Sequence, residues 1–165
     1  MKREMDQVGL LLCDVQGKIF EQSVTSEECS SSIFIRRYMN SKFVSRMDNL
    51  TFINESMTIE EIFEELDIEY GKTSYGKIKF SVNEMYWIGY IYRYLSYVYQ
   101  IDSKNAYKII KGTELRHLFF AYHSLDPMSA IDRILEAKSL VLDKDSSQLT
   151  KEGVKILRSI KKLKN

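Results

Sequence analysis

The sequence predicts a mainly α-helical domain of the α+β type, in which a helical bundle surrounds a central tyrosine-rich helix and a small β-hairpin lies near the N-terminus. Residues 81–101 are apolar on almost every side and include six tyrosines, which is typical of a buried central helix. Helix-start signals precede and follow this stretch. A short apolar run near the N-terminus, followed by turn residues, favours the hairpin. With 165 residues, the chain is long enough to form one core.

The central helix is expected to start at Ser81, because Ser81 and Glu84 have the spacing of a capping box. One narrow strip of small or polar residues runs along it: Gly89, Arg93, Ser96 and Gln100. The charge of Arg93 and the tyrosine hydroxyls would lack partners in hydrocarbon, so we exclude a membrane span. Gly89 and Ser96 would let another backbone approach this strip. Arg93 is therefore expected to be partly buried, either in a salt bridge with an acidic residue of the helix after Thr58 or at an anion or partner site.

The predicted β element has three parts. Residues 7–13 and 18–24 would form two strands, joined by a turn at residues 14–17. Residues 77–80 would add a short edge strand. The same leucine run could also belong to a buried helix, so this alternative stays open.

The other helices are predicted from their caps. We expect one helix from caps at residues 30–32 to about Met47 and another from the capping box of Thr58 and Glu61, which carries an acidic outer face. Three more helices are expected after the central helix. The first would begin at a cap at Asp102 and end at Gly112, a residue that can adopt the left-handed conformation after a helix. The second would be capped by Thr113, and the third would start with Asp126 as cap and Pro127 as first residue.

The chain is predicted to form a single globular domain over residues 1–138, followed by a linker and a basic amphipathic helix over residues 139–165. Residues 143–148 are polar, and the apolar positions of residues 149–163 recur at helical spacing. Residues 138–165 have eight Lys or Arg against three Asp or Glu, so the remainder of the chain has a net charge of −4. Such a tail could dock on nucleic acid, on its own domain or on an acidic partner.

No motif for catalysis is present. The sequence has no phosphate-binding glycine loop and no nucleophile elbow, and its two histidines lack metal-ligand spacing, so we expect no metal and no cofactor. Cys13 is interpreted as a core residue, because its surroundings are apolar and the chain has no C-x-x-C. The start does not continue as a signal peptide, which favours a cytoplasmic location. A possible polar site combines Tyr122, His123 and Asp126, but the simpler interpretation is that His123 packs between two helices and Asp126 caps the second.

Two sets of residues are candidates for binding macromolecules. Tyrosine and arginine are typical interface anchors, which suggests a protein-binding set: Arg36, Arg37, Tyr86, Trp87, Tyr90, Arg93 and Tyr94. Four basic residues could instead contact nucleic acid, in a region of short helices: Lys104, Lys108, Lys111 and Arg116. Homo-oligomerisation is a further possibility, which the sequence assigns to no particular residues.

Several runs resemble a family of small bacterial proteins whose genes lie beside ADP-ribosyltransferase-like toxin genes. These are residues 86–94 (YWIGYIYRY), 107–111 (YKIIK) and 122–127 (YHSLDP), within a resemblance that spans roughly residues 30–138. The chain departs from the family at Leu95, where a tryptophan is expected, and at Gly112, where a proline is expected. The resemblance implies an antitoxin or immunity protein that neutralises a toxin by direct contact. The alternatives are a DNA-binding regulator and an enzyme that reverses the toxin's modification.

Overall fold

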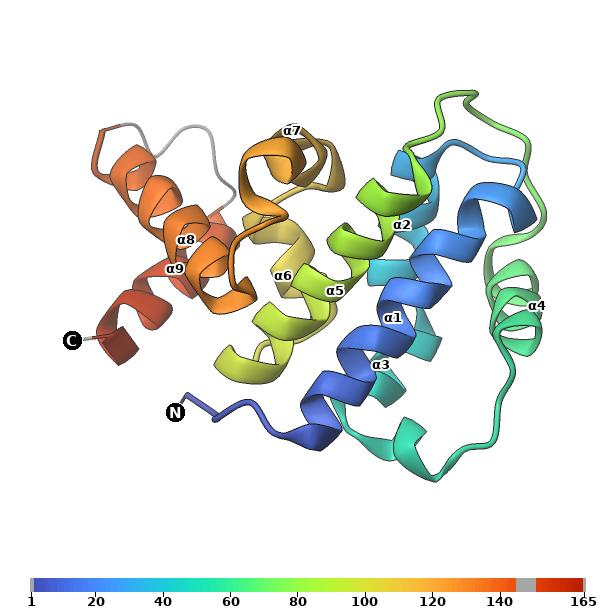
Figure 1. The fold of residues 1–165 in the computed structure, drawn as a ribbon, viewed down its shortest axis with the longest axis horizontal. Helices are drawn as coiled ribbons and strands as arrows, with labels where there is room; N and C mark the ends of the chain where they lie inside the picture. The colour runs from blue at the N-terminus through green and yellow to red at the C-terminus, as the bar shows by residue number, and fades with distance from the viewer. Residues whose placement is uncertain (1, 145–150, 165) are drawn as a thin grey trace.

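The computed structural model describes residues 2–144 and 151–164, and every regular element in them is a helix. Figure 1 shows α5 crossing the middle of the molecule, with α1 beside it and the later helices on its other side. The elements are, in order, α1 (Gln7–Ser26), α2 (Ser31–Met39), α3 (Lys42–Asp48), the 3-10 helix η1 (Thr51–Asn54), α4 (Ile59–Tyr70), α5 (Val82–Tyr99), α6 (Ser103–Ile109), α7 (Gly112–Tyr122), α8 (Pro127–Lys144) and α9 (Lys151–Lys164).

The predicted N-terminal β-hairpin is wrong, because one long helix, α1, spans both of its strands and the turn. Asp6 starts α1 by accepting the backbone N–H of Gly9 at 2.8 Å. Leu12, Ile19 and Phe20 recur at helical spacing and are buried. The predicted edge strand at residues 77–80 is also absent, and this segment instead runs irregularly beside the start of α2.

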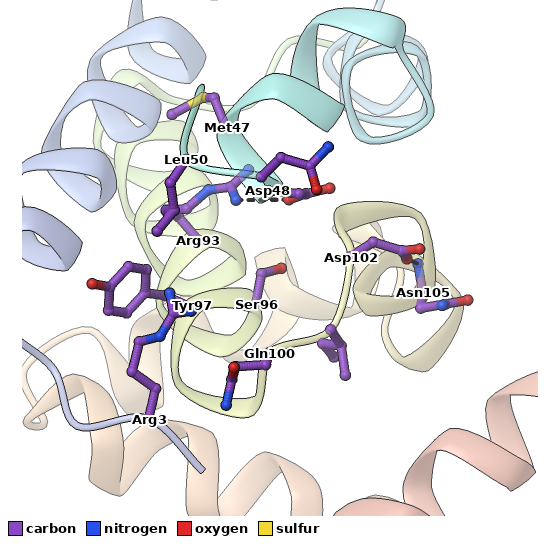
Figure 2. A pocket seen from close by; sticks show the side chains of 12 residues that line it. Arg3, Met47, Asp48, Leu50, Arg93, Ser96, Tyr97, Gln100, Asp102 and Asn105 are labelled. Atoms are coloured by element: carbon purple, nitrogen blue, oxygen red, sulfur yellow. Dashed lines mark hydrogen bonds and ion pairs between the residues drawn. The ribbon is translucent and has the colours of Figure 1, made fainter. Parts of the chain in front are cut away.

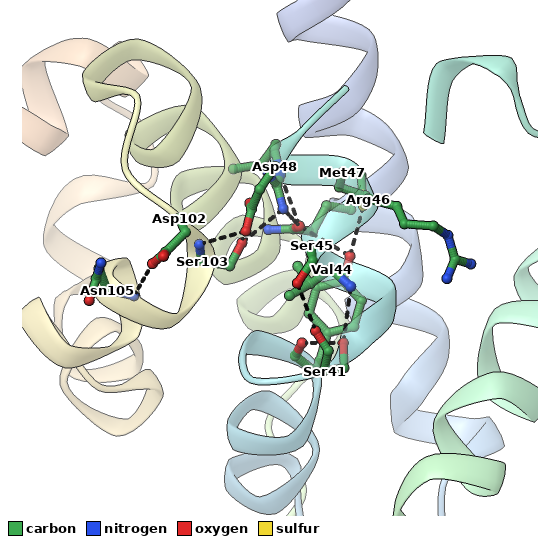
Figure 3. Close-up of polar contacts among 12 residues, drawn as sticks. Ser41, Val44, Ser45, Arg46, Met47, Asp48, Asp102, Ser103 and Asn105 are labelled. Carbon is green, nitrogen blue, oxygen red and sulfur yellow. Dashed lines mark hydrogen bonds and ion pairs between the residues drawn. The ribbon is translucent and has the colours of Figure 1, made fainter. Parts of the chain in front are cut away.

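Two helix boundaries also differ from the prediction. The helix expected through Met47 is broken into α2 and α3, because the hydroxyl of Ser41 caps a new helix by accepting the N–H of Val44 at 3.1 Å (Figure 3). Gly112 does not end a helix but begins α7, whose N-cap is Lys111 and not Thr113. A Cβ at Gly112 would meet the side chain of Ile35 at 2.6 Å, so a small residue is needed for close packing here.

Other start signals are confirmed. The capping boxes at Thr58 and Ser81 are both formed, and they begin α4 and α5. Asp126 precedes α8 and accepts the N–H of Ser129 at 3.1 Å. α8 continues past the boundary predicted at residue 138 and ends at Lys144.

The expected amphipathic helix near the C-terminus is present as α9, which packs against α6 and α8 and buries Leu157 and Ile160. Residues 145–148 of the predicted linker and residues 149 and 150 of the predicted helix lie outside the described residues.

The core is built around α5, which lies antiparallel to α1. Gly9 of α1 lies against the ring of Tyr97, and Gly17 lies against the ring of Tyr86, so small residues of one helix receive large residues of the other. The hydroxyls of these tyrosines donate to Asp6 at 2.8 Å and to Asp14 at 2.6 Å. Asp14 belongs to α1 and Asp6 is its N-cap. The two tyrosine hydroxyls therefore have hydrogen-bond partners, which allows their rings to pack between the two helices. None of the described helices is long and apolar enough to cross a bilayer.

Both cysteines are buried free thiols, and we predict that neither reacts in the native protein. Burial raises the pKa of Cys13 to about 12, so its thiol stays protonated at pH 8, and burial also raises the pKa of Cys29. Iodoacetamide followed by mass spectrometry should therefore show no alkylation in native buffer and two alkylated cysteines in urea. Rapid native alkylation of Cys13 would contradict its placement in the core.

Candidate functional site

Arg93 is the centre of a buried polar network. Only 2% of this residue is exposed, and its guanidinium donates to Gln16 and Asp48 and to the hydroxyl of Ser103. The bond from Nη1 to Asp48 Oδ1 is 2.7 Å long and is also an ion pair. Gln16 in turn donates from Nε2 to the backbone carbonyl of Gly89 and accepts the hydroxyl of Tyr38. The network therefore ties α5 to α1, α2, α3 and α6.

Asp48 holds the α3 end of this network. Its Oδ1 accepts the Ser103 hydroxyl at 2.7 Å, and its Oδ2 accepts the Ser103 backbone N–H at 2.9 Å (Figure 3). The prediction that Arg93 pairs with the helix after Thr58 is wrong, because the partner carboxylate comes from the last residue of α3. The side chain of Asp48 is 11% exposed, whereas that of Arg93 is 2% exposed. The carboxylate is thus the part of the pair that lies nearest to solvent.

A polar pocket of about 430 Å³ opens above this ion pair. Figure 2 shows that its walls come from the α3–η1 turn, the C-terminal half of α5 and the corner between α5 and α6. The lining residues are Arg3, Met47, Asp48, Asn49, Leu50, Arg93, Ser96, Tyr97, Gln100, Ile101, Asp102 and Asn105. Its size falls within the range of small-molecule sites.

Three residues in the wall have unusual features. The hydroxyl of Ser96 is buried and has no hydrogen-bond partner among the described residues. Leu50 and Gln100 have φ values of 61° and 52°, a left-handed conformation that residues other than glycine rarely adopt. Unpaired buried groups and strained backbone both concentrate at binding sites.

The second recess is an apolar groove of about 280 Å³ between α1, η1 and α4. Leu11 and Ile53 line it with 57% and 45% of their surface exposed. Leu12, Phe52 and Ile62 form its base, where they are buried. Because large apolar side chains are exposed in one place, this groove is a candidate for contact with another protein.

The predicted protein-binding residues do not form one surface. Arg93, Trp87 and Tyr94 are buried, so none of the three is available to a partner in this structure. Tyr86, Tyr90 and Tyr94 form a ladder of rings along α5, with centroids 6.1 and 6.3 Å apart. Burial raises the pKa of all three.

The two predicted arginines of α2 lie away from this ladder. Arg37 donates to the carbonyl of Gly71 at 3.1 Å and lies over the ring of Tyr70. Arg36 is exposed on the same helix. Arg37 therefore joins α2 to the end of α4 and is not part of a site with Arg93.

The possible polar site at Tyr122, His123 and Asp126 has no catalytic arrangement. The imidazole of His123 is exposed, stacks on Phe119 and lies 2.7 Å from that residue's carbonyl oxygen. Asp126 caps α8, as predicted, but His123 contacts its own helix and does not pack between two helices. No group of His, Cys, Asp and Glu within residues 2–144 and 151–164 could hold a metal ion.

The candidate nucleic-acid residues belong to α6, α7 and the junction between them. Arg116 pairs with Glu84 at 3.1 Å and lies over the ring of Phe80. Lys111 lies over the ring of Tyr107, and burial lowers its pKa. Lys104 is exposed, and Lys108 is partly buried on the same helix. Arg116 and Lys111 are thus already engaged within the protein.

Sequence reasoning found Arg93 but missed both recesses. The pocket needs Arg3, Leu50 and Asp102, which are far apart in the sequence. The groove depends on α1, which was predicted as strands. One signal was available: in a helix, the three consecutive residues 10–12 cannot all face the core, so some leucines had to be exposed.

The chain matches no protein-family model, no curated protein and no solved structure.

Proposed function

We propose that this protein acts by binding another protein, as the antitoxin-like component of a bacterial toxin–antitoxin or defence module. The observation that supports this most directly is the apolar groove between α1, η1 and α4, which presents exposed Leu11 and Ile53 to solvent. Exposed clusters of this kind are typical of protein contact surfaces. The antitoxin assignment itself comes from the family resemblance.

The charges around the groove indicate what kind of partner it suits. Ile59 lines the groove at the start of α4, and the next residues, Glu60 and Glu61, are exposed, as is Glu64 one turn later. The basic residue in the groove, Lys18, is already paired with Asp14 at 2.7 Å. The uncompensated charge beside the groove is therefore negative. We infer that the partner inserts an amphipathic segment with apolar anchors and flanking Lys or Arg residues.

The groove would replace the central-helix strip as the contact surface. In the sequence-based hypothesis, Arg93 faced the partner, but the structure commits its guanidinium to Gln16, Asp48 and Ser103. The tyrosine ladder of α5 does not line the groove: Tyr86 bonds Asp14 of α1, whereas Leu11 and Val15 of that helix line the groove.

Substitutions in the groove provide the test. The full chain is co-expressed with the protein encoded by the neighbouring reading frame, and both co-purification and growth of the host are measured. We expect the wild type to co-purify with this protein and to restore growth. Leu11→Glu or Ile53→Glu should weaken the complex at least about tenfold, because each loses an apolar anchor and adds negative charge to an acidic rim.

Ile78→Glu is the matched control, because Ile78 is also an exposed isoleucine but lies in the segment before α5, away from the groove. It should bind like the wild type. Glu64→Lys should also weaken the complex, and more so at low salt. If the wild type does not bind the neighbouring protein, or if Leu11→Glu, Ile53→Glu and Ile78→Glu behave alike, the proposal is wrong. Release of ADP-ribose from a modified target would indicate an enzyme instead.

A further inference from the structure

The helix α9 is held to the domain by its apolar side and leaves its basic side exposed. Leu157 and Ile160 are 1% and 3% exposed, and α9 packs against α6 and α8. The exposed side of the helix carries a basic row, which consists of Lys155, Arg158 and Lys162. We propose that the basic row binds the phosphate backbone of double-stranded nucleic acid, independently of base sequence.

The geometry of the basic row suits a regular array of negative charges. Its residues are three and four positions apart, so their side chains project from one face of the helix. From the first to the last, they cover about 10 Å along the helix axis. Duplex DNA carries one negative charge about every 1.7 Å of its axis, so a row of this length faces several phosphates.

The charges of the basic row are not neutralised within the protein. None of its three residues forms an ion pair with another residue in the described part of the chain. In contrast, Lys18 and Arg46 each pair with carboxylates of their own domain. The sequence of α9 has six Lys or Arg residues against a single glutamate. The basic row is therefore free to neutralise phosphates and release their counterions.

The distribution of charge over the molecule favours binding at this end. Figure 1 shows α4 and α9 at opposite ends of the long axis. Glutamates are exposed along α4: Glu60, Glu61, Glu64 and Glu69. A polyanion is repelled by the acidic end and attracted by the basic end, so it meets α9 first.

Other partners for the basic row fit less well. A membrane surface is bound through an apolar helix face, but Leu157 and Ile160 are buried in the domain, and exposed Leu163 alone adds little apolar area. Protein interfaces are rich in aromatic anchors and poor in lysine, whereas α9 has no aromatic residue in its sequence. The same lack of aromatic rings disfavours single strands, which bind by stacking.

The test measures binding of the full chain to a labelled mixed-sequence DNA duplex by fluorescence anisotropy at several salt concentrations. We expect a dissociation constant below about 100 µM at physiological salt, which is the range of non-specific binding. The logarithm of the association constant should fall with the logarithm of the salt concentration with a slope of about −3 or steeper, since each neutralised phosphate contributes about −0.9. A duplex of unrelated sequence should bind equally well.

Removal of the basic row should abolish most of this binding. The triple variant Lys155→Gln, Arg158→Gln and Lys162→Gln should bind at least about tenfold more weakly, with a slope shallower by about 2 or more. Glutamine has a helix propensity close to that of lysine and arginine, and the buried side of α9 is unchanged. The urea midpoint should therefore match that of the wild type, which shows that the domain remains folded.

A second triple variant is the matched control. Lys42→Gln, Lys72→Gln and Lys77→Gln remove the same charge from exposed lysines outside α9, and this variant should bind like the wild type. The inference is overturned if the wild type does not bind the duplex or if the two triple variants bind alike. It is also overturned if vesicles of phosphatidylcholine with about one third phosphatidylserine bind more tightly than the duplex. The described residues of α9 do not line the apolar groove, so this test is independent of the proposed protein contact.

Discussion

Asp48→Asn should lower the free energy of unfolding by about 3–5 kcal/mol, which is a large share of the stability of a domain of this size. The substitution keeps the shape of the side chain but removes the charge that faces the Arg93 guanidinium. Because Arg93 is 2% exposed, its charge would then be buried without a counter-charge. The asparagine also places an NH₂ group where Oδ2 now accepts the N–H of Ser103, so one further hydrogen bond is lost.

Urea denaturation of three variants would measure this effect. Arg93→Met should cost less than Asp48→Asn, because methionine fills the volume and Asp48 keeps both Ser103 bonds at the pocket surface. The double variant should be more stable than the sum of the two single losses implies, by more than about 1 kcal/mol, since the two residues interact directly. Additive losses, or a cost below about 1 kcal/mol for Asp48→Asn, would show that the pair does not organise the fold.

An exposed ion pair of equal length is the control. Lys18 and Asp14 also lie 2.7 Å apart, but their side chains are 57% and 38% exposed, against 2% and 11% for Arg93 and Asp48. Water and salt screen the exposed pair. Lys18→Gln should therefore leave the urea midpoint almost unchanged, which separates the effect of burial from the effect of charge pairing.

The helices that begin with strong local signals were predictable from the sequence. α4 and α5 begin at capping boxes whose serine or threonine and glutamate are three residues apart, so the signal does not depend on tertiary structure. The central position of α5 also followed from its composition, since only buried helices can be apolar on nearly all sides.

The N-terminus was mispredicted because its signal is tertiary. α1 has Leu10 and Leu11 exposed and Gln16 buried, so its burial pattern differs from its hydrophobicity pattern. Gln16 is buried because its side-chain amide accepts hydrogen bonds from Arg93 and Tyr38 and donates one to the carbonyl of Gly89. No periodicity rule places a glutamine in the core.

The site was only half predictable for a related reason. The strip along α5 identified Arg93 as partly buried and paired, but a carboxylate from α3 could be chosen only once α3 was known to end at Asp48 against α6. The break between α2 and α3 turns the chain so that this end meets Ser103. That break depends on one hydroxyl, Ser41, in a stretch whose apolar spacing favoured a continuous helix.

Gly89→Ala should lower the free energy of unfolding by about 1–3 kcal/mol, although alanine favours helices more than glycine does. A Cβ at this position would lie 2.7 Å from the backbone carbonyl oxygen of Gln16 and 2.8 Å from the ring of Phe20. The carbonyl cannot rotate away, because it belongs to the middle of α1. The two helices would have to separate, which would also disturb the bond from Gln16 Nε2 to the Gly89 carbonyl and, through it, the Arg93 network.

Asn83→Ala isolates the contribution of helix propensity, since Asn83 lies in the same helix but is exposed. This variant should be as stable as the wild type or slightly more stable, whereas Gly89→Ala should have a lower urea midpoint. Gly17→Ala should fall between them, because the Cβ would meet the ring of Tyr86, a side chain at the edge of the interface that can shift. A stabilising Gly89→Ala would mean that α1 and α5 are farther apart than the structure places them. In that case α1 and α5 would not make the close backbone contact between Gln16 and Gly89. That contact positions the Gln16 side chain, which accepts hydrogen bonds from Arg93.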